Sequence, residues 1–188
     1  MQVGRLHTRA AVVAAVCSLA ILISACGSTP SGAPATTTAK PATTTRVSST
    51  STTLDAASAV LVAYRAAWAA FEHALTDANP SDPELAATMV DPQLQGVRAN
   101  LLADRRQGII GRGTTTLHPR IVALTATTAT VVDCAYSTAE LVYASTGKPV
   151  PPITPPENDG VRSNLVLLGS TWKVSKQTVT DGSCAPGS

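Results

Sequence analysis

Residues 161–179 read VRSNLVLLGSTWKVSKQTV. The stretch contains two runs rich in β-branched and apolar residues, separated by Gly169-Ser170, a dipeptide typical of a tight turn. In the second run the apolar residues Trp172 and Val174 alternate with polar residues, which are Lys173, Ser175 and Gln177. Alternation places the two kinds of residue on opposite faces of a strand. We therefore predict an antiparallel sheet with one buried face and one face in water.

Three further strands are predicted upstream of this hairpin. β-Branched and aromatic residues dominate the segments 117–124, 129–138 and 141–143. Five prolines between positions 149 and 156 predict an extended connection, and we expect Asn158-Asp159-Gly160 to close it with a turn. All predicted strands thus lie in the second half of the chain.

The chain ahead of residue 108 has the periodicity of helices. Between residues 61 and 75 large apolar side chains recur at steps of three and four, which predicts one long helix with a single buried face. Asp82-Pro83 and Asp91-Pro92 each predict the start of a shorter helix. Helices followed by strands indicate an α+β fold, in which N-terminal helices pack on a curved antiparallel sheet in a cone-like arrangement. The apolar residues of the long helix are Leu61, Tyr64, Trp68, Phe71 and Leu75.

The first 26 residues have the layout of an export signal. Residues 1–9 are basic, and residues 10–23 form an apolar run that is too short for a stable membrane-spanning helix. The run ends in Ile23-Ser24-Ala25-Cys26, which resembles the bacterial lipobox. The resemblance implies cleavage before Cys26 and transfer of a diacylglyceryl group to its sulfur. Two acyl chains, such as palmitate, would then hold the protein at the cell membrane.

We therefore divide the chain into three parts. Residues 1–25 are a lipoprotein signal peptide, residues 26–53 are the lipidated cysteine and a linker, and residues 54–188 are a folded domain. The linker is rich in Ser, Thr, Pro and Ala, and Val47 is its one large aliphatic residue. Such a segment cannot bury enough apolar area to offset its ordering entropy, so we predict that it is disordered.

The charge of the chain argues against one class of partner. The formal net charge is +2 at pH 7, and from residue 54 onward acidic residues outnumber basic residues. A surface that binds nucleic acid normally carries a marked excess of Lys and Arg. We therefore expect no nucleic-acid partner.

The cysteines predict a structural crosslink. Processing would discard Cys17 and leave Cys26, Cys134 and Cys184. If Cys26 is acylated, two thiols remain outside the cytosol, where an even pair predicts a disulfide. We expect the bridge between Cys134 and Cys184 to attach the C-terminal tail to the sheet. A redox role is disfavoured because the chain has no Cys-x-x-Cys motif.

No established catalytic motif is present. The sequence lacks a Gly-x-Ser-x-Gly elbow, a phosphate-binding loop and a dinucleotide-binding glycine motif. His73 and His118 are predicted on different elements, with no cysteine or acid cluster at ligand spacing around them. We therefore expect neither a metal site nor a cofactor.

The order of the predicted elements points to a known group of proteins. Three helices and four or five strands, ending in Gly169-Ser170-Thr171-Trp172-Lys173-Val174, resemble secreted actinobacterial lipoproteins with a nuclear-transport-factor-2-like (cystatin-like) domain. The resemblance extends from Leu54 to Cys184. A small β-sandwich preceded by helices is the alternative fold.

Some proteins with this fold are enzymes, and the resemblance implies where a catalytic site would lie. Ketosteroid isomerase and polyketide cyclases use an acid and a tyrosine that face an apolar cavity, where desolvation raises the pKa of the acid. Here the comparable pair is Asp133 and Tyr64, with His118 and Arg120 as weaker candidates. For Asp133 we favour the interpretation that it is an exposed residue of a strand over the interpretation that it is a catalytic acid. The side chains that could line a cavity mouth are Tyr64, Trp68 and Phe71.

These observations lead to one expected function and two alternatives. We expect a lipoprotein anchored through Cys26 to the extracytoplasmic face of the cell membrane. It would not be an enzyme, and it would bind a small apolar ligand or a partner protein of the envelope. The alternatives are an isomerase-type or cyclase-type enzyme that uses Asp133, and a purely structural envelope component.

Overall fold

The computed structural model describes residues 50–153, 155–182, 184 and 185, without the side chains of residues 50–54. The predicted signal peptide, Cys26 and most of the predicted linker lie outside the described residues. All described residues belong to one compact unit, which contains Ser49–Ser188. Within this part of the chain, no helix has the length and apolar character needed to cross a membrane.

Three helices form the first half of the described chain: α1 Thr50–Leu75, α2 Pro83–Thr88 and α3 Gln93–Gln107. The carboxylate of Asp82 caps α2, because its Oδ1 accepts a hydrogen bond from the amide of Glu84 at 2.8 Å. α3 ends at Gly108, whose φ of 67° lies in the left-handed region that favours glycine. The predicted helix start at Asp82-Pro83 is thus confirmed.

The second half of the described residues forms two antiparallel sheets. β1 pairs with β5 in a two-stranded sheet. In the five-stranded main sheet, β4 pairs with β2 and β3 on one side and with β6 on the other, and β7 pairs with β6. The strands are β1 Ile109–Arg112, β2 Thr115–Thr116, β3 Arg120–Leu124, β4 Thr128–Ser137, β5 Glu140–Tyr143, β6 Glu157–Leu168 and β7 Thr171–Thr180.

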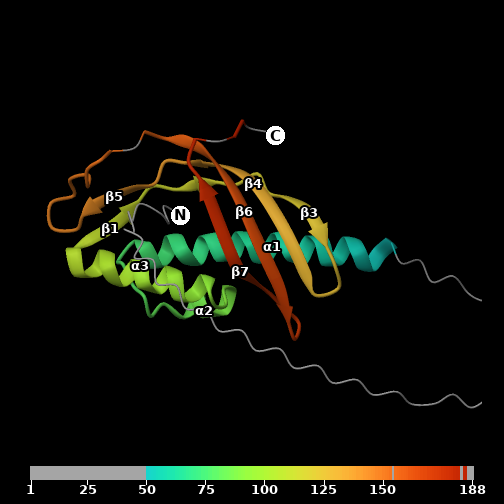
Figure 1. Cartoon of the computed structure of the whole chain (residues 1–188). Helices are drawn as coiled ribbons and strands as arrows, with labels where there is room; N and C mark the ends of the chain where they lie inside the picture. Colours follow the sequence, from blue (N-terminus) through green and yellow to red (C-terminus); the bar gives the residue numbers. More distant parts are fainter. Residues whose placement is uncertain (1–49, 154, 183, 186–188) are drawn as a thin grey trace, which may run out of the picture. The chain divides into compact units, whose positions relative to one another are not determined.

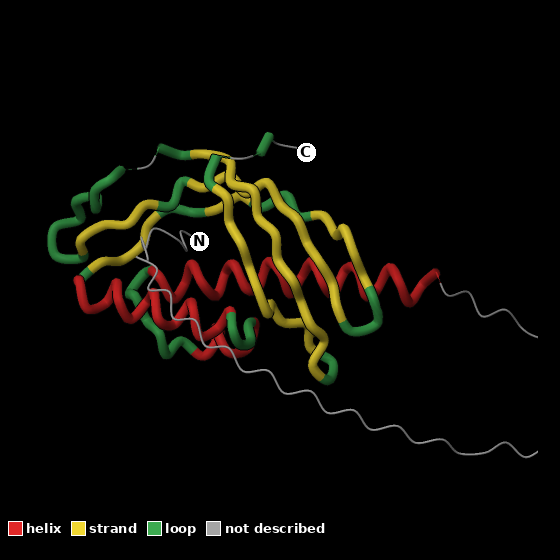
Figure 2. The backbone as a smooth tube through the Cα atoms, viewed as in Figure 1, coloured by secondary structure: helices red, strands yellow, loops and turns green. Residues whose placement is uncertain are grey.

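The helices cover one face of the curved main sheet. Figure 1 shows α1 running across the strands, with α2 and α3 beside it. The backbone trace in Figure 2 shows the same layering of helices on strands. The segment between α2 and α3 extends the β7 edge, because the amide of Val90 donates to the carbonyl of Val174 at 3.0 Å. The predicted α+β fold with helices on a curved antiparallel sheet is confirmed.

The strand predictions were wrong at two places. The short strands β1 and β2 were missed, because Gly111 and Gly113 interrupt the apolar pattern there. Asn158-Asp159-Gly160 does not form a turn but lies inside β6, where it pairs with residues 134–136 of β4. Pairing along the whole length of β4 outweighs the local turn preference of these three residues.

The core lies between α1 and the main sheet. Large side chains with less than 2% exposure come from the helices and from both sheets, and the apolar ones of the helices and the main sheet belong to one interior, to which Val142 of β5 does not belong. Each buried side chain of Leu or Val size contributes about 1.5–3 kcal/mol relative to an exposed one. The apolar members of this set are Val60, Tyr64, Leu85, Met89, Val97, Leu101, Val131, Val142, Leu165 and Val174.

A bulge in the last hairpin changes which face Gln177 occupies. Leu165 pairs with Val174, but Asn164 pairs with Lys176, so one residue of β7 is extra and the alternation shifts beyond it. Gln177 consequently pairs with the buried Ser163, and its side-chain polar atoms are buried. The prediction that Gln177 lies on the wet face was wrong, because strict alternation cannot reveal a bulge.

Candidate functional site

Tyr64 and Asp133 meet inside the domain. The hydroxyl of Tyr64, on α1, donates to Oδ2 of Asp133, on β4, at 2.9 Å. Tyr64 is 0% exposed and Asp133 is 6% exposed. The expectation that Asp133 is an exposed strand acid was wrong, because α1 covers the face of β4 on which its side chain lies.

The other oxygen of Asp133 is also occupied. Its Oδ1 accepts a hydrogen bond from the backbone amide of His118 at 2.7 Å. Nδ1 of His118 lies 3.1 Å from the carbonyl oxygen of Cys134, and because a carbonyl oxygen only accepts, Nδ1 is the donor in this bond. The predicted candidates Tyr64, Asp133 and His118 therefore come together, whereas Arg120 lies exposed at the start of β3.

The surroundings of Tyr64 change its acidity. Burial raises the pKa of the Tyr64 hydroxyl well above its ordinary value, and the negative charge of the neighbouring Asp133 raises this pKa further. The indole of Trp68 opposes the rise, although its Nε1 makes no hydrogen bond of acceptable geometry. Tyr64 is therefore a neutral hydrogen-bond donor at physiological pH and not a source of phenolate.

The raised pKa predicts a loss of stability at alkaline pH. In the unfolded chain Tyr64 ionises near its ordinary pKa of 10.0, whereas in the folded domain it stays protonated. Above that pH the unfolded state binds fewer protons than the folded state. The free energy of unfolding should therefore be unaffected by Tyr64 below pH 10 and should fall by about 1.4 kcal/mol for each pH unit above it.

Urea unfolding at a series of pH values measures this slope. Tyr64→Phe should remove it. Tyr143→Phe is the matched control, because Tyr143 is 40% exposed and should leave the slope in place. If the free energy of unfolding fell equally steeply above pH 10 in wild type and in Tyr64→Phe, the raised pKa of Tyr64 would not be the cause.

Further polar atoms are buried on the same interior face. Oγ of Ser163, Nε1 of Trp68 and both side-chain polar atoms of Gln177 have no hydrogen-bond partner among the described residues. Ser163 and Gln177 are direct neighbours across β6 and β7. The sequence interpretation missed Ser163, although its position midway between the inward Val161 and Leu165 was a usable signal. Tyr64, Asp133, Trp68, Ser163 and Gln177 are called the interior polar cluster below.

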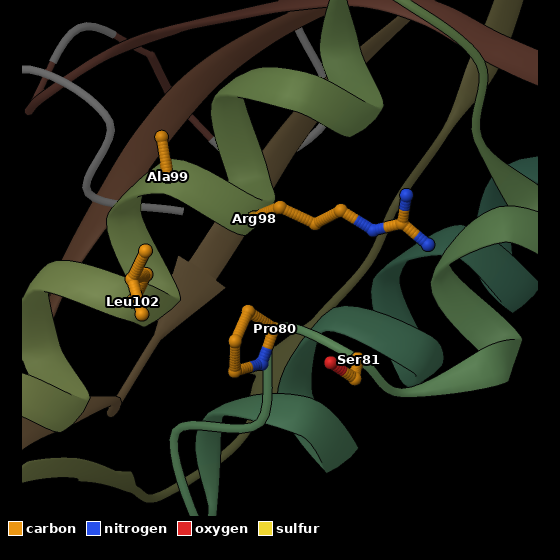
Figure 3. A pocket seen from close by; sticks show the side chains of 5 residues that line it. All are labelled: Pro80, Ser81, Arg98, Ala99 and Leu102. Carbon is orange, nitrogen blue, oxygen red and sulfur yellow. The ribbon is translucent and has the colours of Figure 1, made fainter.

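The hollows of the surface lie elsewhere. One of about 480 Å³ lies between the loop at Pro80 and Ser81 and the α3 residues Arg98, Ala99 and Leu102. Figure 3 shows the five side chains that line it. A second hollow, of about 280 Å³, lies between α1, α2 and the β6–β7 turn. Neither is lined by any of the side chains predicted to line a cavity mouth. These are Tyr64, Trp68 and Phe71, and all three belong to the packed core.

The surface hollow bounded by α1, α2 and the β6–β7 turn is called the α1–α2 hollow. None of its lining residues carries a charge, and Val62 at its margin is 64% exposed. Its lining residues are Ala59, Val62, Ala63, Ala66, Ala87, Thr88, Ser170, Thr171 and Trp172.

His73 has acidic neighbours that the sequence interpretation did not foresee. Its Nδ1 lies 2.9 Å from Oδ2 of Asp82, and the carboxylate of Glu84 lies close by. The loop between α1 and α2 turns back on the helix, which brings residues nine and eleven positions apart together. The expectation that no acid lies at ligand distance from His73 was wrong.

Cys134 and Cys184 form a disulfide across a sequence separation of 50 residues. Cys134 is 4% exposed, and it lies on the opposite face of β4 from Asp133. The bridge ties the segment after β7 to the central strand of the main sheet, as the sequence predicts. It therefore holds the strand that carries Asp133 from the side that the helices do not cover.

Comparisons with known proteins concern the fold. No protein-family model matches this chain, and no curated protein matches it in sequence. The intermembrane space region of the chloroplast protein ARC6 superposes with a TM-score of 0.53 at 14% identity, covering 66% of this chain and 96% of that one.

Two bacterial structures are also similar. A scytalone dehydratase-like protein from Novosphingobium aromaticivorans has a TM-score of 0.48 at 16% identity, covering 70% of this chain and 87% of that one. An uncharacterized protein with a cystatin-like fold from Caulobacter vibrioides has a TM-score of 0.43 at 14% identity, covering 70% of this chain and 92% of that one. At such identities the similarity concerns the fold alone, which is an arrangement of helices on a curved antiparallel sheet.

Proposed function

We propose that this chain is an extracytoplasmic lipoprotein, anchored to the membrane through Cys26, whose folded domain is a non-enzymatic module that binds a partner protein of the envelope. The observation that carries the proposal is the burial of the candidate catalytic pair in the core. The acid and the tyrosine that could act in catalysis bond to each other at 2.9 Å and are almost completely buried. A substrate would have to displace packed core side chains to reach them.

The extracytoplasmic location rests on two independent features. The lipobox-like sequence Ile23-Ser24-Ala25-Cys26 follows a basic and apolar leader. The disulfide between Cys134 and Cys184 belongs to an oxidising compartment. The linker after Cys26 would then hold the domain clear of the lipid surface, at a mean reach of roughly 30 Å for a flexible coil of its length.

Anchoring through Cys26 is tested by replacing that residue. Cys26→Ala in the full chain should carry no diacylglyceryl group, because the acyl chains have no other acceptor, and any of it that is cleaved should leave the membrane fraction. Cys17→Ala is the matched control and should leave the protein in the membrane fraction. Intact mass should show a diacylglyceryl group on wild type and on Cys17→Ala. Unmodified Cys26 in membrane-bound wild type would refute the anchor.

The α1–α2 hollow is the surface that we assign to the partner, and the partner would insert an apolar side chain there. Its uncharged lining and the exposed Val62 suit such a side chain better than a polar one. A charge at position 62 should therefore oppose binding, while glutamate keeps good helix propensity at this exposed site of α1.

The experiment is crosslinking in intact membranes, followed by purification of the full chain and mass spectrometry. A protein that crosslinks to wild type should be lost with Val62→Glu and retained with Val122→Glu, a control at a valine of β3 that is 43% exposed. Equal recovery with both variants would reject the hollow as the contact surface. Recovery of bound lipid without protein would favour the apolar-ligand alternative.

An enzyme of the isomerase or cyclase type is the second candidate. The pairing of Asp133 and Tyr64 on the interior face, beside the unpartnered hydroxyl of Ser163, is the specific observation in its favour. Such an enzyme needs the core to open around Asp133. Such opening should make the amides of β4 exchange hydrogen faster than the amides of β6. Equally slow exchange in both strands would count against the enzyme.

A further inference from the structure

A second group of chemically active side chains lies where α1 ends and α2 begins, away from the interior polar cluster. One ring nitrogen of His73 and one carboxylate oxygen each of Asp82 and Glu84 all lie within 4.8 Å of one another. Nδ1 of His73 and Oδ2 of Asp82 are 2.9 Å apart. We propose that His73, Asp82 and Glu84 form a binding site for a divalent cation of the zinc class.

The fold holds these ligands in place. The amide of Asn79 donates to the carbonyl of Ala74 at 2.7 Å, and the amide of Ser81 donates to the side chain of Asn79 at 3.1 Å. These bonds close the loop back onto the end of α1, which sets the spacing between His73 and Asp82. The side chain of Asp82 is only 4% exposed, so one of the three ligands is fixed before a cation arrives.

The donor set determines the class of cation. One imidazole nitrogen with two carboxylate oxygens suits Zn²⁺ and similar transition metals, whereas Mg²⁺ and Ca²⁺ prefer oxygen ligands alone. Ligand atoms around a tetrahedral zinc are about 3.4 Å apart for bonds of about 2.1 Å. Zinc would therefore lengthen the separation of 2.9 Å between His73 and Asp82 and shorten the longer separations within the group of three, and the exposed side chains of His73 and Glu84 can both move.

The charge of the ligands also suits a cation, because two carboxylates balance the charge of a dication. The three protein ligands leave a fourth tetrahedral position for water. By contrast, a purely structural role as helix cap needs only Oδ1 of Asp82, which accepts from the amide of Glu84.

The test is zinc binding by the full chain, purified from membranes in detergent and freed of metal with a chelator. Zn²⁺ is titrated in competition with a chromophoric chelator. Wild type should bind one equivalent, and His73→Gln and Glu84→Gln should each raise the dissociation constant at least about tenfold. Both substitutions are at exposed positions, and Asp82 is left intact so that α2 keeps its cap.

The control is His118→Gln, which removes the other histidine of the described residues and should leave zinc binding unchanged. Mg²⁺ in excess should not displace Zn²⁺ from wild type. The proposal is overturned if wild type binds no zinc, if His73→Gln and Glu84→Gln bind it as wild type does, or if Mg²⁺ competes equally. None of these outcomes depends on the proposed lipid anchor or on a partner protein.

Discussion

Replacing both Cys134 and Cys184 with alanine should lower the free energy of unfolding by about 4 kcal/mol. The disulfide closes a loop across a sequence separation of 50 residues, and without it the unfolded chain gains the entropy of an open loop. Alanine suits position 134, because Cys134 is 4% exposed and a serine there would bury a hydroxyl. An effect of this size is a large part of the total stability of a domain of this length.

Urea unfolding of the full chain, followed by tryptophan fluorescence, measures this loss. Trp68 and Trp172 are 3% and 7% exposed, so both report on the core. Wild type in reductant should unfold at the same midpoint as the double variant. If the double variant kept the midpoint of oxidised wild type, the bridge would make no contribution to stability.

The second large effect is expected at Asp133. Asp133→Ala leaves the hydroxyl of Tyr64 and the amide of His118 without their acceptor, and each unpaired buried donor costs about 1–3 kcal/mol. The expected loss is about 3 kcal/mol in total. Asp133→Asn keeps one acceptor oxygen, so its loss should be smaller, about 1.5 kcal/mol.

The matched control for this prediction is Asp77→Ala, at an exposed position in the loop after α1, where a change within about 0.5 kcal/mol is expected. A double-mutant cycle with Tyr64→Phe isolates the bond between the two side chains. The coupling free energy should be about 0.5–3 kcal/mol. A loss at Asp133 no larger than that at Asp77 would show that the buried carboxylate has no structural role.

The same Asp133 illustrates how far sequence reasoning reached at the candidate site. Tyr64 and Asp133 could be named as a pair from the resemblance, because a tyrosine on the long helix and an acid on a central strand match the pattern of that fold. The burial of Asp133 could not be predicted. Alternation fixes only which residues share its face, and the placement of α1 decides whether that face is inside or outside.

The His73 site shows a different limit. Asp82 was correctly predicted as the start of a helix, since an acid before Pro83 is a local signal. Its contact with His73 depends on how the loop between the helices turns, and the bond from Asn79 to Ala74 that sets this turn has no distinctive sequence pattern. Local signals thus identified the helix start at Asp82 but not the contact between Asp82 and His73.

By itself the sequence determined the class of the fold, the order of most elements and the pairing of the two cysteines. These properties follow from local periodicity, turn residues and a count of thiols, which do not depend on distant contacts. Only the tertiary structure decided that Tyr64 bonds to Asp133, that Gln177 faces inward and that Asp133 is buried. A one-residue bulge and the docking of a helix set those features, and both arise from packing between segments far apart in the chain.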